Sequence, residues 1–317
     1  MVKNERSPRP MGESTLLRRI LARWQLYLLL ILPLAWLILF CYTPMTGLVL
    51  AFKKYNAGKG VWGSPWVGLA NFQNFFSSYK SSMVIKNTLV LSLYSLLVGF
   101  PIPILFALLL NVLPGKRYKK TIQTVTYVPY FFSTVIMVGL LFQLLDYRIG
   151  LYGTLYRLIT GEVAPNILAS GTNFKHIYVW SGIWQSTGYN AIIYIAALST
   201  ADMALHEAAM IDGATRGQRI RRITVPLIMP TVTIMTLLSI GKIMYGDFGM
   251  VYALIGDNGV LYETTDIIDT YVFRVLRQTG DPSQAMAIGL FQSVIGFLMV
   301  YGSNTLVKRK FGDGALF

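Results

Sequence analysis

Cysteine and histidine are almost missing from this chain of 317 residues. It has one cysteine, Cys41, and two histidines, His176 and His206. A single thiol excludes an internal disulfide framework and a cysteine-based metal site, so Cys41 is expected to act as a small buried apolar residue. The topology derived below places the two histidines on opposite sides of a membrane, which excludes a shared metal or proton relay.

Charged residues and enzyme motifs are also scarce. Charged side chains make up 13% of the chain, and the sequence contains no G-x-S-x-G, H-E-x-x-H or G-x-x-x-x-G-K-[ST]. We therefore expect no catalytic residue, no metal and no cofactor in this chain. The stretch GKGVWG (58–63) fits G-x-G-x-x-G, but it runs into SPW instead of a helix, so it is interpreted as a flexible loop.

Long apolar runs dominate what is present, with 54% hydrophobic residues. A helix needs about 20 residues to cross the hydrocarbon core, and no run alternates like a strand of a membrane barrel. The sequence thus predicts an all-α integral membrane protein with six transmembrane helices. The predicted spans are 24–52, 88–112, 121–145, 177–201, 226–245, which is interrupted only by Lys242, and 285–307.

Positive charges give the orientation. The segments 1–23, 113–120, 202–225 and 308–317 hold 17 of the 28 Lys and Arg residues. The positive-inside rule places them, and so both termini, in the cytoplasm. The net charge of +14 is then mainly a topology signal, and nucleic acid is not an expected partner. The expected organisation is a cytoplasmic tail (1–23), one membrane domain (24–307) and a second cytoplasmic tail (308–317).

One cytoplasmic segment, EAAMIDGATRGQRIRRITVP (207–226), is unusually rich in arginine. Asp202 is a plausible N-cap for a helix that Gly213 would stop, a second helix can start at Thr215, and Pro226 would end the segment. Such a helical foot could dock in a groove of a cytosolic partner. The physics alone equally allows a solvated basic loop that obeys only the positive-inside rule.

The spacing in this segment distinguishes the two interpretations. It resembles the signature E-A-A, x3, G, x9, I-x-L-P of permease subunits of binding-protein-dependent ABC importers, with Val225 where that family more often has Leu. The matching residues are Glu207, Ala208, Ala209, Gly213, Ile223 and Pro226. The stretches WQLYLLLILPLAWLILFCYTPMTGLVLAFKKYN (24–56), GLANFQNFF (68–76) and DIIDTYVFRV (266–275) are similar to its oligosaccharide and polysaccharide branch.

The resemblance implies a type I ABC importer permease fold and several partners. The loop 202–226 would hold the coupling helix, which docks on a cytosolic ATPase dimer that binds ATP and Mg²⁺. A second, non-identical permease subunit would complete the pathway, and an extracytoplasmic solute-binding protein would deliver the sugar. Such a protein would reside in the bacterial cytoplasmic membrane. The competing hypothesis is an ion- or proton-coupled secondary transporter or channel.

A sugar pathway requires hydrogen-bonding groups and aromatic faces inside the bundle. The fourth predicted span offers Gln185 with Trp184 and Tyr189, and the fifth offers Ser239 and Lys242, followed by Tyr245. The alternative for each aromatic residue is a place in the interfacial belt or in packing. If Lys242 faces the cavity, an acidic oligosaccharide becomes a reasonable substrate; the alternative is a lysine paired with Asp247 or with a partner chain.

The segment DIIDTYVFRVLRQ (266–278) repeats apolar residues at helical spacing. This pattern predicts a short amphipathic helix on the outer membrane face. A helix that covers the ends of the bundle is the alternative.

Overall fold

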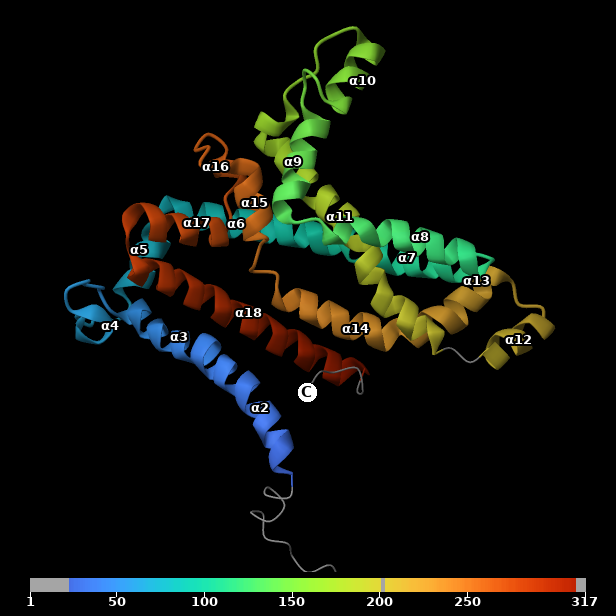
Figure 1. Cartoon of the computed structure of the whole chain (residues 1–317), viewed down its shortest axis with the longest axis horizontal. Coiled ribbons are helices and arrows are strands. Elements are labelled where there is room, and N and C mark those ends of the chain that lie inside the picture. Colours follow the sequence, from blue (N-terminus) through green and yellow to red (C-terminus); the bar gives the residue numbers. More distant parts are fainter. Residues whose placement is uncertain (1–22, 201–202, 312–317) are drawn as a thin grey trace, which may run out of the picture.

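The computed structural model describes residues 23–200 and 203–311. Within them, the regular structure is helical apart from one antiparallel bridge between Lys53 and Trp66 (Figure 1). Most of the two predicted tails and the predicted cap Asp202 lie outside the described residues.

The helical elements follow one another along the chain with short connections. In order they are α2 (Trp24–Leu37), η1 (Ile38–Tyr42), α3 (Thr43–Met45), η2 (Thr46–Phe52), α4 (Gly60–Gly63), α5 (Ala70–Ser77), α6 (Tyr79–Tyr94), η3 (Ser95–Gly99), α7 (Pro101–Val112), α8 (Lys116–Tyr127), η4 (Val128–Phe131), α9 (Thr134–Leu145), α10 (Leu151–Thr160), η5 (Ile167–Ala169), α11 (Gly171–Ser199), α12 (Met203–Ile211), α13 (Arg216–Arg219), η6 (Ile220–Thr224), α14 (Val225–Gly241), α15 (Phe248–Ile255), α16 (Tyr262–Thr265), α17 (Ile268–Arg274), η7 (Val275–Thr279) and α18 (Pro282–Phe311).

Four continuous helices among the described residues are long and apolar enough to cross a membrane. They cover Trp24–Phe52, Tyr79–Val112, Arg216–Gly241 and Pro282–Arg309, each of which contains or matches most of a predicted span. The 29-residue helix α11 covers the fourth predicted span but is not one of these four. The described part of the chain is therefore all-helical, with four spanning helices by this criterion, or five if a bent pair counts as one span.

That bent pair replaces the predicted continuous span 121–145. Helices Lys116–Phe131 and Thr134–Leu145 meet at 100°. Pro129 lies in the first turn of η4 and lacks an N–H group, and Phe132 and Ser133 are extended. The Ser133 hydroxyl then accepts the N–H of Ile136 and so caps α9 as a new helix. The break was foreseeable from the proline, but the angle was not.

Other prolines do not break their helices. Pro226, predicted to end the cytoplasmic segment, lies inside one continuous helix that runs from Arg216 to Gly241. A π turn, Ile220–Thr224, immediately precedes it, and Val225 donates to the oxygen of Ile220. A π turn also precedes Pro101. The wider turn shifts the hydrogen-bond register, which accommodates a residue without an N–H group.

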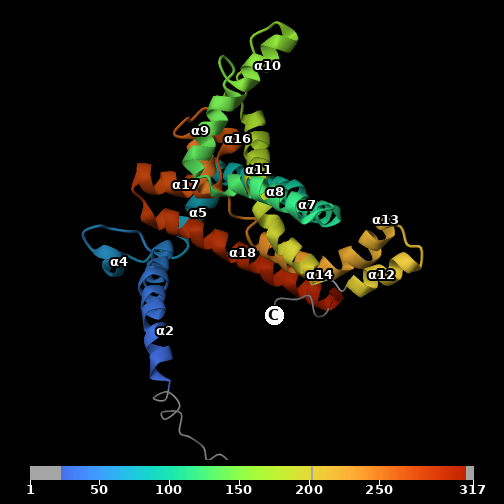
Figure 2. The ribbon, with the colours of Figure 1, turned by 45° about the vertical axis from the view of Figure 1, so that its right-hand side comes forward.

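The long helices pack as a bundle, except for the first. Helix α11 contacts α7 and α14, and α18 contacts α14 and η2. Helix α2 stands apart in both views (Figures 1 and 2) and has no buried residue. Cys41, in the same span, is exposed, so the prediction of a buried cysteine is wrong for this chain on its own.

Helix α17 belongs to the body of the protein. Ile268, Tyr271 and Val275 are buried in a core shared with Phe75 and Ile288 from α5 and α18. The helix therefore covers one end of the bundle, and the prediction that it lies on the membrane surface is wrong. Its apolar stripe faces other helices, a distinction that periodicity alone does not make.

Candidate functional site

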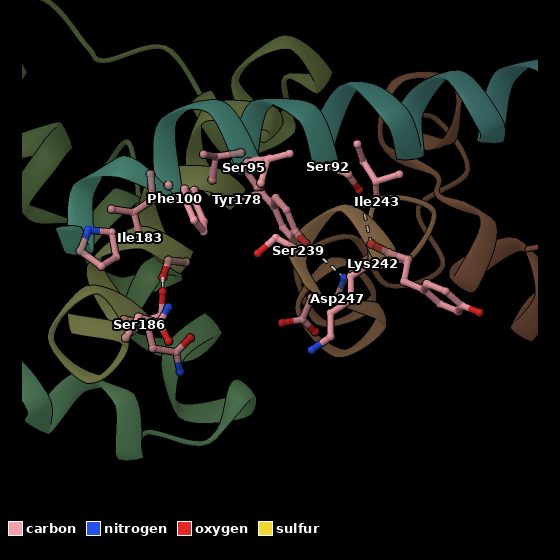
Figure 3. Close-up of a pocket in the computed structure, with 18 of the residues that line it drawn as sticks. Ser92, Ser95, Phe100, Tyr178, Ile183, Ser186, Ser239, Lys242, Ile243 and Asp247 are labelled. Carbon is pink, nitrogen blue, oxygen red and sulfur yellow. Dashed lines mark hydrogen bonds between the residues drawn. The ribbon is translucent and has the colours of Figure 1, made fainter. Parts of the chain in front are cut away.

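A cavity of about 520 Å³ lies where α6, α11 and α14 converge. Figure 3 shows Ser92 and Ser95 on one wall, Tyr178, Ile183 and Ser186 on α11, and the end of α14 opposite. The cavity is lined by apolar side chains together with hydroxyl, amide and charged groups. Its polar lining residues are Ser92, Ser95, Tyr178, Gln185, Ser186, Asn190, Tyr194, Ser239, Lys242, Tyr245 and Asp247.

The turn that follows α14 forms one side of this cavity. Helix α14 ends at Gly241, and the backbone turns at Lys242 before α15 begins at Phe248. Two lining residues from other helices hold the turn: Ser92 donates to the oxygen of Tyr245 at 3.3 Å, and the N–H of Asp247 donates to the Tyr178 hydroxyl at 3.1 Å. The cavity therefore has a hydrogen-bonded rim built from three separate parts of the chain.

The two charged side chains of the lining have different surroundings. Asp247 accepts the N–H of Met250 at 2.9 Å and so caps α15. The ion pairs of the described residues are Asp266 with Arg274 and Asp257 with Arg277, so Lys242 forms none. The alternative in which Lys242 pairs with Asp247 is thus not what the structure shows. Lys242 is exposed at the end of its helix, where its ammonium group can stay hydrated.

The structure separates the six predicted pathway residues into two groups. Gln185, Ser239, Lys242 and Tyr245 line the cavity. Trp184 and Tyr189 do not; they lie beside the bent segment, as does Gln185, whose Nε2 donates to the oxygen of Phe132 at 3.0 Å. Tyr189 stacks on Tyr130 with ring centroids 3.7 Å apart, and Trp184 lies 6.4 Å from Phe132. Their placement matches the packing interpretation, because rings beside Gln185 in sequence point elsewhere on a helix.

Sequence reasoning did not identify Ser92, Ser95, Tyr178 or Asn190 as lining residues. Asn190 lies four and five residues beyond Ser186 and Gln185, so helical spacing could have found it. Ser92 and Ser95 lie on a different helix, and only the packing of α6 against α11 brings them to the cavity.

The predicted coupling segment begins with a well-formed helix. Glu207, Ala208 and Ala209 lie on α12, which ends in a Schellman motif: Ala214 donates to the oxygen of Ala209 at 2.9 Å, and Gly213 to that of Met210 at 3.1 Å. Gly213 has a φ of +77°, which favours glycine. The predicted helix stop at Gly213 is therefore confirmed.

The second part of the segment is a separate helix. It starts at Thr215, as the sequence predicted, and Thr215 and Gln218 form a capping box there. Ile223 and Pro226 lie further along this helix, so the six signature residues are divided between two elements. Helices α12 and α13 lie at the same end of the molecule as the start of α8, and the basic segments 113–120 and 203–225 therefore share one side (Figure 1). This arrangement agrees with a single basic face.

Comparison with known proteins decides the family. Residues 99–312 match the binding-protein-dependent transport system inner membrane components. The chain belongs to this family. It is 38% identical over 295 residues to protein LplB of Bacillus subtilis (strain 168), covering 93% of this chain and 91% of LplB. It is 37% identical over 302 residues to the polygalacturonan/rhamnogalacturonan transport system permease protein YteP of the same organism, covering 95% and 93%.

Comparison with solved structures also points to ABC transporter subunits. A chain of a bacterial ABC transporter involved in the import of the acidic polysaccharide alginate superposes with a TM-score of 0.85 at 36% identity, covering 93% of this permease and 99% of that chain. A chain of bacterial alginate ABC transporter in complex with alginate pentasaccharide-bound periplasmic protein gives a TM-score of 0.84, also at 36% identity, with 93% and 97% covered.

This permease is therefore a multi-pass membrane subunit of a binding-protein-dependent ABC importer of the carbohydrate type. The prediction that it is a transport subunit without enzymatic activity, with ATP hydrolysis on a separate subunit, is confirmed by the family. Family membership decides against the secondary transporter or channel.

Proposed function

We propose that this permease imports an acidic oligosaccharide and that Lys242 contacts a carboxylate of the sugar in the cavity. One observation carries the proposal: Lys242 lines the cavity without an ion pair to any residue that the structure describes, whereas Asp247 is engaged as a helix cap. Hydroxyl and amide groups around it suit sugar hydroxyls, and an ammonium group supplies a charge-assisted hydrogen bond to a carboxylate.

The relatives support an acidic substrate. The name of YteP specifies polygalacturonan and rhamnogalacturonan, and the matching solved transporter imports alginate. Polygalacturonan and alginate are both polymers of uronic acids, which carry a carboxylate on each sugar. A cation in the cavity would distinguish such chains from neutral ones of similar size.

The assembly and topology are part of the same proposal. Six spans with both termini in the cytoplasm would place α12 and α13 against a cytosolic ATPase dimer that holds ATP and Mg²⁺. A second, non-identical permease subunit would close the pathway in the bacterial inner membrane, and an extracytoplasmic solute-binding protein would bring the sugar. Ala208 and Ile211 of α12 are exposed, Ile211 at 86%, which suits a helix that docks in a groove.

Sugar-stimulated ATP hydrolysis tests the substrate. The importer would be reconstituted with its solute-binding protein, and ATPase activity measured against neutral and uronic-acid oligosaccharides of equal length. Lys242→Ala should reduce stimulation by acidic sugars by about tenfold or more, since a hydrogen bond to a charged group contributes about 1.5–3 kcal/mol. Lys242→Arg keeps the charge and should keep most of the response.

Neutral sugars provide the internal control. If they stimulate wild type as well as the acidic ones do, and Lys242→Ala changes neither response while the complex stays assembled, the acidic substrate is wrong. Loss of stimulation by every sugar in both Lys242 variants would assign the lysine a structural role instead.

A further inference from the structure

The first outer segment folds back on the end of the first span and forms a compact, hydrogen-bonded loop, residues 53–67. Lys54 donates its N–H to the oxygen of Pro65, and Val67 donates to that of Phe52, each at 2.9 Å, so the two ends of the loop are joined. The Asn71 side chain donates to the oxygens of Ala51 and Lys53, both at 2.9 Å. GKGVWG, predicted to be a flexible loop, instead contains the helical turn α4.

A buried lysine organises the interior of this loop. Lys53 is 9% exposed, and its Nζ donates to the oxygens of Val61 and Trp62 at 3.2 and 2.8 Å. The Ser64 hydroxyl accepts the N–H of Asn56 and donates to the oxygen of Gly60. The positive charge of Lys53 is therefore used internally, and the backbone around Trp62 is fixed by side chains.

The scaffold presents two tryptophans outward. Trp62 is 72% exposed and Trp66 63%. Trp66 stacks on Phe52, the last residue of the apolar span, with ring centroids 5.7 Å apart. Both indoles thus lie directly beyond the end of a helix long enough to cross the bilayer. Tryptophan in a membrane protein concentrates at that depth because its ring is apolar and its N–H is polar.

The charge of the segment has one sign only. Residues 53–87 contain five lysines and no aspartate or glutamate. With Lys53 engaged inside the loop, Lys54 and Lys59 remain exposed beside the tryptophans. By contrast, the outer segment 246–284 contains six acidic residues and two arginines. Basic charge is therefore concentrated on the loop that adjoins the first span.

We propose that the loop 53–67 is an interfacial anchor that binds anionic phospholipid headgroups at the outer end of the first span. Trp62 and Trp66 insert at headgroup level, and Lys54 and Lys59 contact lipid phosphates. This anchor would hold the first span, whose residues 24–45 are exposed, at a defined depth. The proposal does not depend on which sugar is carried.

A saccharide is less well matched to this surface. Every lining residue of the cavity lies at position 92 or later, so no residue of the loop contributes to it. The loop is tied instead to the start of α18, where the N–H of Tyr55 donates to the Ser283 hydroxyl at 2.9 Å. In Figure 2, α4 lies beside the outer end of the first span and away from α11.

A reporter on the loop tests the proposal in the assembled importer. Ala57→Cys in a Cys41→Ser background would carry a bimane label in a complex whose partner subunits lack cysteine. Quenching would be compared in phosphatidylcholine vesicles containing headgroup-region nitroxide-labelled phosphatidylcholine or phosphatidylglycerol. We expect stronger quenching by phosphatidylglycerol, weakened by salt, and a preference that falls about fivefold for each of Lys54→Gln and Lys59→Gln. Trp62→Ala with Trp66→Ala should reduce quenching by both lipids.

Arg157→Gln supplies the matched control, because it removes an exposed outer base on α10, outside the loop. It should leave the lipid preference unchanged. Absence of quenching, equal quenching by the two lipids, or an equal effect of Arg157→Gln would overturn the anchor. Displacement of phosphatidylglycerol by an oligogalacturonate would assign the surface to the saccharide instead.

Discussion

The carboxylate of Asp269 accepts the main-chain N–H of Gly246, with Oδ2 2.9 Å from the nitrogen. Asp269 lies on α17, whereas Gly246 lies in the turn that borders the cavity. Gln292 of α18 donates from the same Nε2 to the oxygen of Met244 at 2.7 Å and to the Asp269 carboxylate at 3.2 Å. The turn that carries Lys242 and Tyr245 is thus held on its other side by hydrogen bonds from α17 and α18.

The close packing behind this turn predicts the effect of a small substitution. A Cβ at Gly246 would lie 2.4 Å from Cδ1 of Ile267, so Gly246→Ala should destabilise the protein by about 1–3 kcal/mol. Because the turn would shift, the sugar concentration for half-maximal ATPase stimulation should also rise. Adding Ile267→Val removes the clashing methyl group and should restore much of the stability and of the sugar response. Thermal unfolding and sugar titration of the three proteins measure this; a double variant no better than Gly246→Ala would contradict it.

The buried ion pair between Asp266 and Arg274 predicts a large, pH-dependent loss of stability when the arginine is replaced. Arg274 donates to Asp266, and its guanidinium lies 3.9 Å from the centre of the Tyr262 ring. Burial raises the pKa of the Asp266 carboxyl, while the hydrogen bond from Thr270 and the charge of Arg274 oppose the increase. Arg274→Met should cost about 3–5 kcal/mol, because it leaves a buried carboxylate unpaired.

The sign of the pH effect follows from that raised pKa. In the Arg274→Met variant the folded state holds the Asp266 proton more tightly than the unfolded chain does. The loss in free energy of unfolding relative to wild type should therefore be smallest in acid and grow as the pH rises through the folded-state pKa of Asp266. Unfolding of the purified complex across pH measures it. Asp266→Asn combined with Arg274→Met should recover part of the loss at neutral pH, and a deficit independent of pH would refute the account.

The structure at the end of α12 predicts that alanine is harmful at Gly213 but tolerated at the nearby Gly217. Gly213→Ala forces a residue with a Cβ into a left-handed conformation and should cost about 1 kcal/mol of local stability. A Cβ at Gly217, on α13, would have no atom within 4 Å, so Gly217→Ala should be neutral or slightly stabilising. Sugar-stimulated ATPase activity should fall in the first variant and not in the second. Equal activity in both would argue against a coupling role for the α12 end.

The class of this protein, a helical membrane protein, was predictable from local sequence pattern and composition. In a membrane, a long apolar run without strand-like alternation satisfies its backbone N–H and C=O groups by forming a helix. The spans near 24–52 and 285–307 were therefore predictable from their length. The helix end at Gly213 and the capping box at Thr215 were predictable because their signals act over four or five residues. The family signature from Glu207 to Pro226 was readable for the same reason.

Tertiary packing decided the rest. Which side chains of α11 border the cavity depends on where α6 and α14 lie: Gln185 lines it and the adjacent Trp184 does not, although both lie beside Phe132 of the bent segment. The 100° bend at Pro129 and the continuous helix through Pro226 depend on alternative hydrogen-bond partners that a proline does not itself specify. Lys53 looks in sequence like any other basic loop residue, yet the fold buries it, because carbonyls of Val61 and Trp62 converge on its ammonium group. Signals within short stretches of sequence were enough for a helical membrane permease, because they act locally, whereas contacts between distant segments decided which polar residues face the cavity and which are buried in the protein interior.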